Sequence, residues 1–314
     1  MKQPLVSIVI PVYNGTNYMR EAIDSALAQT YENKEVLVVN DGSNDDGATE
    51  RLALSYGDKI RYFSKENGGS SSALNFGIEH MRGEWFSWLS HDDLYLPGKL
   101  ESQMRRVSEK GLDDGKTVIR CGTVLVDAEG KPMLYNSVQN RRMYTPLELL
   151  DKLLLHSTIN GCAMLIPKTL LDQTGGFDTS LRYLNDWEMW IRFALHGVSM
   201  DSYDEVLVKN RVHGGQVSVK QKSLYLQERP RIMSQTVDYI HQHGLGSDFM
   251  RVALYASAGY GDKEALNKAR KALREQKAYH MATHLQCGRY RVQKAIGRSM
   301  RSVYHGVQHL LWKK

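Results

Sequence analysis

Four apolar runs in the first 90 residues each end in a short polar cluster, and this repeated arrangement constrains the fold most. The runs span residues 5–10, 34–39, 60–63 and 84–89, and the clusters span residues 11–15, 40–43, 64–70 and 90–93. Near-continuous Val, Ile and Leu indicate strands buried on both faces, as in parallel sheets. Helical spacing fills the gaps over residues 16–27, 45–56 and 70–82, with Thr16 or Asn17 as the expected first cap. The sequence predicts βαβ units of an α/β fold.

Each polar cluster offers groups that a charged ligand needs. Ligands of open α/β sheets bind outside the carboxyl ends of the strands, so the clusters are expected to face one crevice. Asp41 can accept hydrogen bonds from a ribose or a base edge, or it can stabilise a turn. Residues 67–69 (Asn-Gly-Gly) either let the backbone approach an anion ahead of a helix or form an ordinary turn. Asp92 and Asp93 suit a hard cation such as Mg²⁺ or Mn²⁺, although solvated loop aspartates are common. A nucleotide diphosphate with a metal is the simplest ligand that uses all of them.

Two familiar nucleotide-binding classes are excluded by the first polar cluster and by the rest of the chain. A dinucleotide-binding dehydrogenase would carry Gly-x-Gly-x-x-Gly after the first strand, where this chain has Pro-Val-Tyr-Asn-Gly at residues 11–15. A P-loop NTPase would need Gly-x-x-x-x-Gly-Lys-Ser/Thr, which occurs nowhere in the sequence.

Seven motifs, in order, resemble the successive blocks of family 2 glycosyltransferases, which have the GT-A fold. They are residues 8–14 (IVIPVYN), 39–43 (VNDGS), 66–69 (ENGG, with Asn75), 88–93 (WLSHDD), 175–178 (GGFD), 185–192 (NDWEMWIR) and 211–218 (RVHGGQVS). The resemblance implies a Rossmann-like mixed sheet flanked by helices. It also implies an inverting hexosyl- or deoxyhexosyltransferase that uses a nucleotide sugar, and we expect a UDP- or dTDP-sugar. The rival from another class is a catalytically silent nucleotide-sugar-binding module.

The resemblance also implies roles for individual side chains. The nucleotide-binding set is Pro11, Tyr13, Asn14, Asp41, Asn67, Asn75, Ser90 and His91. The expected ligands of Mn²⁺ or Mg²⁺ are Asp92, Asp93 and His213. The family's metal motif usually reads Asp-x-Asp-Asp, and this chain has Ser90 at its first position, which leaves Asp92 as the best ligand.

The acceptor half of the chain carries the expected catalytic base. Inversion by direct displacement needs a base near the acceptor hydroxyl, and Asp186 matches the family's catalytic carboxylate, although an aspartate there could also cap a helix. Asn185 stands where a glutamate is commoner in the family. Trp187 could stack on an acceptor sugar or belong to the core. In the family, the arginine matching Arg211 lies close to the diphosphate.

Length and composition fit one α/β domain and a smaller module. We expect a catalytic domain over residues 1–218, with a nucleotide-sugar half (1–115) and an acceptor half (116–218), followed by a basic helical region over residues 219–314. Three scattered cysteines give neither zinc spacing nor a disulfide framework. No signal peptide and no bilayer-spanning apolar run are expected, so we expect a cytoplasmic enzyme.

The last 53 residues are strongly basic, with thirteen Lys or Arg and three acidic residues. Their pattern predicts two helices split near residues 287–288. In the second helix one face is apolar from Val292 to Leu310 and the other is basic, so the helix could lie on anionic lipid at the inner membrane face. Packing on the catalytic domain or in a homodimer is the alternative. Nucleic acid is not expected as a partner because no nucleic-acid module is recognisable. The expected process is bacterial surface-polysaccharide biosynthesis.

Overall fold

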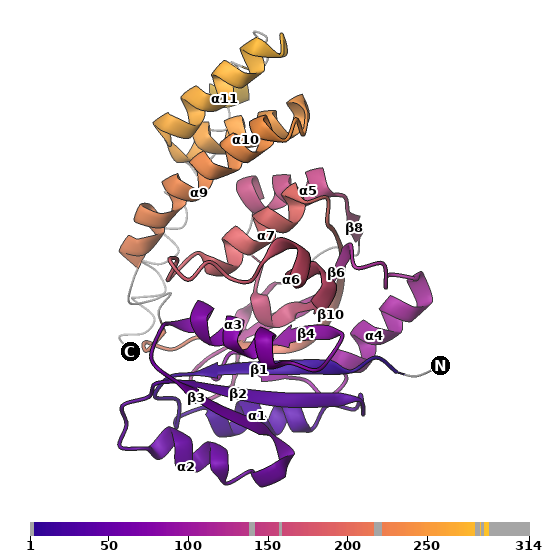
Figure 1. Cartoon of the computed structure of the whole chain (residues 1–314), viewed down its shortest axis with the longest axis vertical. Helices are drawn as coiled ribbons and strands as arrows, with labels where there is room; N and C mark the ends of the chain where they lie inside the picture. The colour runs from indigo at the N-terminus through magenta and orange to yellow at the C-terminus, as the bar shows by residue number, and fades with distance from the viewer. Residues whose placement is uncertain are drawn as a thin grey trace. The chain divides into compact units, whose positions relative to one another are not determined.

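The computed structural model describes residues 3–137, 142–156, 159–216, 222–279, 283 and 286–288 (Figure 1). The chain forms two compact units, one of residues 1–149 with 158–225 and one of residues 150–157 with 226–314. Residues 150–157 thus join the second unit, although they lie within the predicted acceptor half. The assignment of catalysis to residues 1–218 stays a prediction.

The first unit begins with alternating strands and helices, as the sequence predicts. Its first part consists of β1 (Val6–Val12), α1 (Met19–Leu27), β2 (Lys34–Asp41), α2 (Ala48–Leu54), β3 (Arg61–Lys65), α3 (Ser70–His80), β4 (Trp85–Trp88), β5 (Leu94–Tyr95) and α4 (Lys99–Lys110). The rest consists of β6 (Thr117–Val126), β7 (Pro132–Ser137), β8 (Arg142–Tyr144), α5 (Pro146–Asp151, whose last residues belong to the second unit), β9 (Met164–Pro167), α6 (Lys168–Thr174), α7 (Asn185–Leu195) and β10 (Ser199–Arg211). Short 3-10 turns lie at Gly57–Lys59 and Gly161–Ala163.

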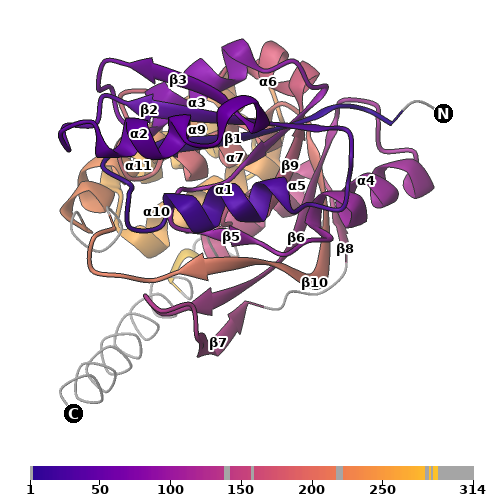
Figure 2. The same ribbon diagram turned by 90° about the horizontal axis from the view of Figure 1, so that it is seen from below.

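The strands of the described residues form one mixed sheet in the order β3-β2-β1-β4-β9-β6-β10-β5, with β7 on β6 and β8 on β10. The first four strands in that order are mutually parallel, so their carboxyl ends lie at one edge. The antiparallel β9 then joins β4 to β6, and the long β10 runs parallel to β6 (Figure 2). The predicted mixed α/β fold is confirmed.

Successive side chains of β1 point to opposite faces of the sheet. Ile8 and Ile10 belong to a buried cluster with Met19 and Ile23 of α1, whereas Val9 lies against Gly77 of α3. Figure 1 accordingly shows α1 and α2 below the parallel strands and α3 above them. The apolar stripe of α1 therefore explains both the existence of the helix and its side of the sheet.

The prediction that Thr16 or Asn17 caps α1 is wrong. Neither Thr16 nor Asn17 caps the helix, because a turn precedes it and Tyr18 stands at the N-cap position without a side-chain hydrogen bond. The backbone N–H groups of Tyr18 and Met19 instead donate to the carbonyl of Gly15, at 3.2 and 2.9 Å. The chain thus satisfies these first amides with its own backbone, and no side-chain oxygen is needed.

Pro11 occupies a central strand, where its missing N–H could have broken a ladder. The carbonyl of Val9 accepts from Leu89 N–H on the β4 side, and Pro11, two residues on, faces the same side. The ladder between β1 and β4 ends at Val9 and Trp88. Pro11 therefore lies beyond the end of β4, where no partner strand requires its N–H.

The second unit is helical in its described part. It contains a short π-helix (Lys152–His156), most of α9 (Lys222–Gln242), α10 (Ser247–Tyr260) and α11 (Lys263–Glu275). A buried ion pair joins Arg229 of α9 to Asp262, the residue before α11, at 2.9 Å. In the described part of the chain, no helix has both the length and the apolar character needed to cross a bilayer. The predicted amphipathic helix over residues 289–310 lies outside the described residues.

Candidate nucleotide-sugar site

Asp41 ends β2 and fastens the glycine loop that precedes α3. Its Oδ1 accepts from the Lys65 ammonium at 2.8 Å and from the N–H of Gly68 at 3.0 Å, and its Oδ2 accepts from the N–H of Gly69 at 2.7 Å. The side chain of Asn67 donates to the backbone carbonyl of Asp41 at 2.8 Å. Asp41 and Asn67 thus shape the loop between β3 and α3, and direct contact of either residue with a nucleotide stays a prediction.

Tyr13 and Asn14 form a second polar surface, where β1 ends. Asn14 adopts the left-handed backbone region, with φ +50°, which asparagine tolerates better than most residues. Its side chain donates to Oδ1 of Asn44 at 2.7 Å and accepts from Asn44 N–H at 2.9 Å. Tyr13 is 44% exposed, which is high for an aromatic residue at the end of a buried strand. A flat, exposed ring here is suited to stack on a base.

Asp93, predicted as a metal ligand, is buried and fully engaged by the protein. Its two oxygens accept from the Asn210 amide at 3.0 Å each, from Arg211 N–H at 2.8 Å and from the Cys162 thiol at 3.2 Å. Burial and the neighbouring Asp92 carboxylate raise its pKa to about 7. A metal at Asp93 would have to displace these donors. The observed hydrogen bonds instead tie the segment after β4 to residues 162, 210 and 211.

Asp92 lies at the edge of the site and interacts with His213. Its Oδ2 lies 3.0 Å from Nε2 of His213 and 3.1 Å from the Gln216 amide nitrogen. Nδ1 of His213 accepts from Gly215 N–H at 3.2 Å, so in this arrangement Nε2 carries the ring hydrogen and donates to Asp92. His91 belongs to the same cluster, and burial lowers its pKa.

These residues fit a cation in part. Asp92 offers a carboxylate that is 12% exposed, and carboxylate oxygens are ligands that Mg²⁺ and Mn²⁺ prefer. Ligation by Nε2 of His213 would require the other tautomer and hence loss of the Gly215 contact. Among the described residues, no group of three His, Cys, Asp or Glu side chains is arranged to hold a metal. A cation here would therefore take most of its ligands from the diphosphate and water.

Arg211 is built into the protein and does not project toward a ligand. Its guanidinium is 2% exposed and donates to Glu21 at 2.7 Å, to the carbonyl of Ala128 at 2.6 Å and to the carbonyl of Asp92 at 2.9 Å. The guanidinium also lies over the ring of Tyr18, 4.4 Å from its centroid. The predicted diphosphate contact would need this network to open, whereas the observed contacts support the loop that carries Asp92.

Asp186 is the second residue of α7, where free backbone N–H groups point outward. Its Oδ1 accepts from Trp187 N–H at 2.6 Å, and its own N–H donates to Oδ1 of Asn185 at 2.9 Å. Among the described residues, none donates a hydrogen bond to Oδ2. Burial raises the pKa of Asp186 to about 6, above the usual 3.8. The residue is not the helix cap, and one of its oxygens is open for proton transfer.

Three other predicted residues have structural contacts. The Asn75 amide makes two hydrogen bonds with the backbone of Phe177, and Trp187 is 4% exposed, as in a core. The backbone N–H of Ser90 donates to the Cys162 sulfur at 3.3 Å. Nucleotide contact by Asn75 or Ser90 and stacking by Trp187 therefore stay predictions without support from these contacts.

The structure brings both halves of the first unit to the same edge of the sheet. Asn185 donates to the hydroxyl of Ser71 in α3 at 2.9 Å, and the ring of Trp88 meets Phe177 edge to face. Sequence reasoning missed the supporting residues of this edge, which are Glu21, Lys65, Cys162, Asn210 and Gln216. Gln216 lay within a family motif and Lys65 within the polar cluster of residues 64–70, whereas the other three carried no sequence signal.

Comparison with solved structures defines the class of fold. Over 88% of this chain and 93% of the other, the structure resembles S. aureus TarS in complex with UDP-GlcNAc, with a TM-score of 0.59 and 16% sequence identity. The predicted GT-A type of fold is thereby confirmed.

Sequence comparison defines the family within that class. Residues 7–174, more than half of the chain, match the profile of glycosyl transferase family 2, and the chain belongs to this family. An uncharacterized glycosyltransferase of Rickettsia typhi is 53% identical over 216 residues, which are 68% of this chain and 66% of that protein. A Rickettsia felis relative is 51% identical over 218 residues, which are 69% of this chain and only 36% of that protein.

Proposed function

We propose that the chain transfers a sugar from a nucleotide-diphosphate sugar to a hydroxyl group of a glycan or lipid-linked acceptor, with inversion at the anomeric carbon. The observation that carries the proposal is Asp186, a carboxyl group with an open oxygen and a raised pKa of about 6. A base with a pKa near the working pH combines a deprotonated state with proton-accepting strength. Family membership supports the reaction class.

In the proposed reaction, Oδ2 of Asp186 takes the proton of the acceptor hydroxyl. The hydroxyl oxygen bonds to the anomeric carbon while the bond from that carbon to the diphosphate oxygen breaks on the opposite face. The nucleoside diphosphate leaves with the electron pair. The loop held by Asp41 and the exposed ring of Tyr13 would bind and orient the nucleotide.

A divalent cation, Mn²⁺ or Mg²⁺, would be held by Asp92, with His213 as a second ligand in its other tautomer. When bound, it would neutralise charge on the leaving diphosphate. Arg211 holds the carbonyl of Asp92 in place through its Nε. We propose UDP or dTDP as the nucleotide, a choice supported by the UDP-GlcNAc complex of S. aureus TarS.

We also propose a place for the reaction, at the inner face of a bacterial cell membrane in surface-polysaccharide synthesis. The organisms of these relatives, Rickettsia typhi and Rickettsia felis, support only the bacterial setting. The basic composition of the last 53 residues supports peripheral attachment to anionic lipid.

The test is a screen of UDP-, dTDP- and GDP-sugars with Mn²⁺, followed by Asp186→Asn on the sugar donor that works. We expect kcat to fall by about 10²-fold or more, because the amide cannot accept the proton, while sugar-donor binding measured by thermal shift is retained. Asp248→Asn is the matched control, because Asp248 is also the second residue of its helix, α10. If the wild type binds a nucleotide sugar but never transfers it, the silent binding module is the correct assignment.

A further inference from the structure

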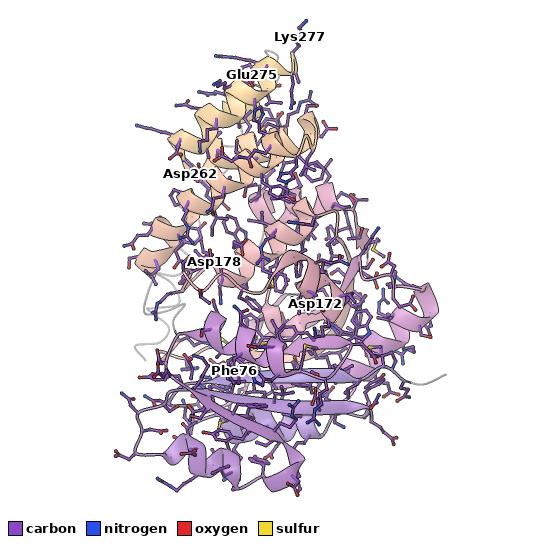
Figure 3. All side chains as sticks on the ribbon, viewed as in Figure 1. Phe76, Asp172, Asp178, Asp262, Glu275 and Lys277 are labelled. Carbon is purple, nitrogen blue, oxygen red and sulfur yellow. The ribbon has the colours of Figure 1, made fainter. Side chains whose placement is uncertain are left out.

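The segment of residues 174–177 begins at the last residue of α6. It is bound to α3 by two hydrogen bonds from one side-chain amide. The Nδ2 of Asn75 donates to the carbonyl of Phe177 at 2.8 Å, and its Oδ1 accepts from Phe177 N–H at 2.7 Å. A single side chain thus satisfies both backbone polar groups of a residue 102 positions away. Figure 3 labels the neighbours of the two partners, Phe76 on α3 and Asp178 in the loop before α7.

The fit between Asn75 and the segment is close. A Cβ added to Gly176 would lie 2.3 Å from Oδ1 of Asn75, nearer than real Cβ atoms approach another heavy atom. Gly176 has no left-handed backbone that would require glycine. The glycine is therefore explained by the space that the Asn75 amide occupies.

The same segment is also bound by α7. Arg192 donates from Nη1 to the carbonyls of Thr174 and Gly175 at 2.6 and 2.9 Å, and from Nη2 to the carbonyl of Gly176 at 2.7 Å. Glu188, one turn earlier in α7, orients the guanidinium through contacts of 2.9 and 3.0 Å. Three consecutive carbonyls are thereby tied to the helix that begins with Asn185 and Asp186.

A third contact fixes the N-terminal end of α7. Asn185 donates to the hydroxyl of Ser71 at 2.9 Å, and its Oδ1 accepts from Asp186 N–H at 2.9 Å. The N-terminal end of α3 follows the glycine loop that Asp41 binds. The hydrogen bonds of Asn75, Arg192 and Asn185 therefore connect the N-terminal end of α7, which carries Asp186, to α3.

We propose that Asn75 and Arg192 are positioning residues, which hold α7 against α3 through residues 174–177 and thereby set the place of the Asp186 carboxylate. The proposal rests on the function proposed above. It assigns Asn75 a part in catalytic geometry instead of the nucleotide contact that the family resemblance implies. Misplacement of a reacting group by about 1 Å can cost about 10²-fold in rate.

The test uses two variants that disturb the contact in different ways. Asn75→Ala removes the amide. Gly176→Ala keeps the Asn75 side chain, but the added Cβ would displace its amide group. We expect kcat to fall by about 10- to 100-fold in both, with the Kd for UDP unchanged and the pH midpoint of kcat moved from its wild-type value. Arg192→Lys keeps the positive charge but loses the second nitrogen donor of the guanidinium. We expect the same fall in kcat, with the Kd for UDP unchanged. The controls are Asn33→Ala, which removes one amide contact remote from the site, and Gly98→Ala, where an added Cβ meets nothing.

Hydrogen exchange provides a measure that does not depend on turnover. In Asn75→Ala, the amides of residues 177 and 185–188 should exchange faster than in the wild type, whereas those of α10 should not. Unchanged exchange there, or a weakened Kd for UDP with normal kcat, would overturn the proposal and return Asn75 to the nucleotide site. If the wild type binds UDP but transfers no sugar, the proposed function fails, and the exchange data alone then decide whether the contact holds α7.

Discussion

At the scale of single residues, three aspartates of the site differ in what surrounds them. Asp41 accepts from an ammonium and two backbone N–H groups. Asp93 is buried beside another carboxylate, and its pKa is raised to about 7. Asp186 keeps one oxygen open and has a pKa of about 6. Their surroundings give the first two carboxylates supporting parts and leave the third available for proton transfer.

The raised pKa of Asp186 predicts the pH dependence of transfer. The base acts only when deprotonated, so kcat should rise with pH and level off above about 6. At pH 5 it should be about one tenth of the plateau, since one unit below the pKa leaves a tenth of the group ionised. Stopped-flow or quenched assays with saturating sugar donor would measure the profile. A rate that stays flat down to pH 4.5 would exclude Asp186 as the group that titrates.

The raised pKa of Asp186 also predicts how the stability of the folded state changes with pH. An acid whose pKa is raised on folding stabilises the folded state at low pH, and this contribution is lost as the pH rises through about 6. Asp186→Asn should therefore gain stability relative to the wild type between pH 4 and pH 7. This comparison separates a shifted carboxyl from an ordinary one without an activity assay.

The metal proposal predicts that Asp92→Ala abolishes transfer and weakens binding of a nucleoside diphosphate, because the cation that screens the diphosphate is lost. Calorimetric titration of UDP with Mn²⁺ and with EDTA would measure the effect. Asp172→Ala, which removes an exposed carboxylate of α6, is the control. Normal turnover of Asp92→Ala in EDTA would show that the reaction needs no cation at this residue.

At the scale of elements, the helices and strands of the first half could be read from the spacing of apolar residues. The helix pattern through Met19 and Leu27 corresponds to α1, and the four predicted strands correspond to β1–β4. The cap of α1 was not predictable from composition, because Thr16 and Asn17 are both favourable cap residues and the chain uses the carbonyl of Gly15 instead. Local patterns thus identify elements better than they identify how elements end.

The close packing of α3 on β1 predicts the effect of adding one methyl group. A Cβ at Gly77 would lie 2.3 Å from Cγ1 of Val9, in the middle of the sheet. Gly77→Ala should lower the free energy of unfolding by about 1–3 kcal/mol, the usual cost of overpacking. Urea denaturation would measure it, with Gly98→Ala as the control that meets open space. Equal midpoints for Gly77→Ala and the wild type would show that α3 moves away at little cost.

At the scale of the whole molecule, the partners of the site residues lie far apart in the sequence. Glu21 and Arg211 are 190 residues apart, and Asn75 and Phe177 are 102 apart. Motif recognition placed Arg211 and Asn75 at the site, but their burial and their partners depend on the tertiary fold. The meeting of the polar clusters at one edge of the sheet was predictable, whereas which of their side chains pack into the protein was not.

The basic C-terminal residues predict salt-dependent binding to anionic vesicles. Each Lys or Arg near such a surface contributes about 1 kcal/mol and is screened by salt. Co-sedimentation with vesicles that contain phosphatidylserine should fall as ionic strength rises, and should be lost when residues 289–314 are deleted. Transfer to a short soluble acceptor should survive this deletion. A truncated protein that changes from dimer to monomer, without vesicle binding by the full chain, would identify the segment as a packing element.

The environment of Asp93 has a consequence for how the protein is made on the ribosome. Its carboxylate sits at the end of the first parallel strands, but the groups that receive it come from residues 162, 210 and 211. A nascent chain that has emerged only as far as residue 93 therefore exposes a carboxylate whose hydrogen-bond donors have not yet been synthesised. The hydrogen bonds of Asp93 are completed only after β10 leaves the exit tunnel, so the segment that follows β4 can reach its folded form only once the second half of the chain is present.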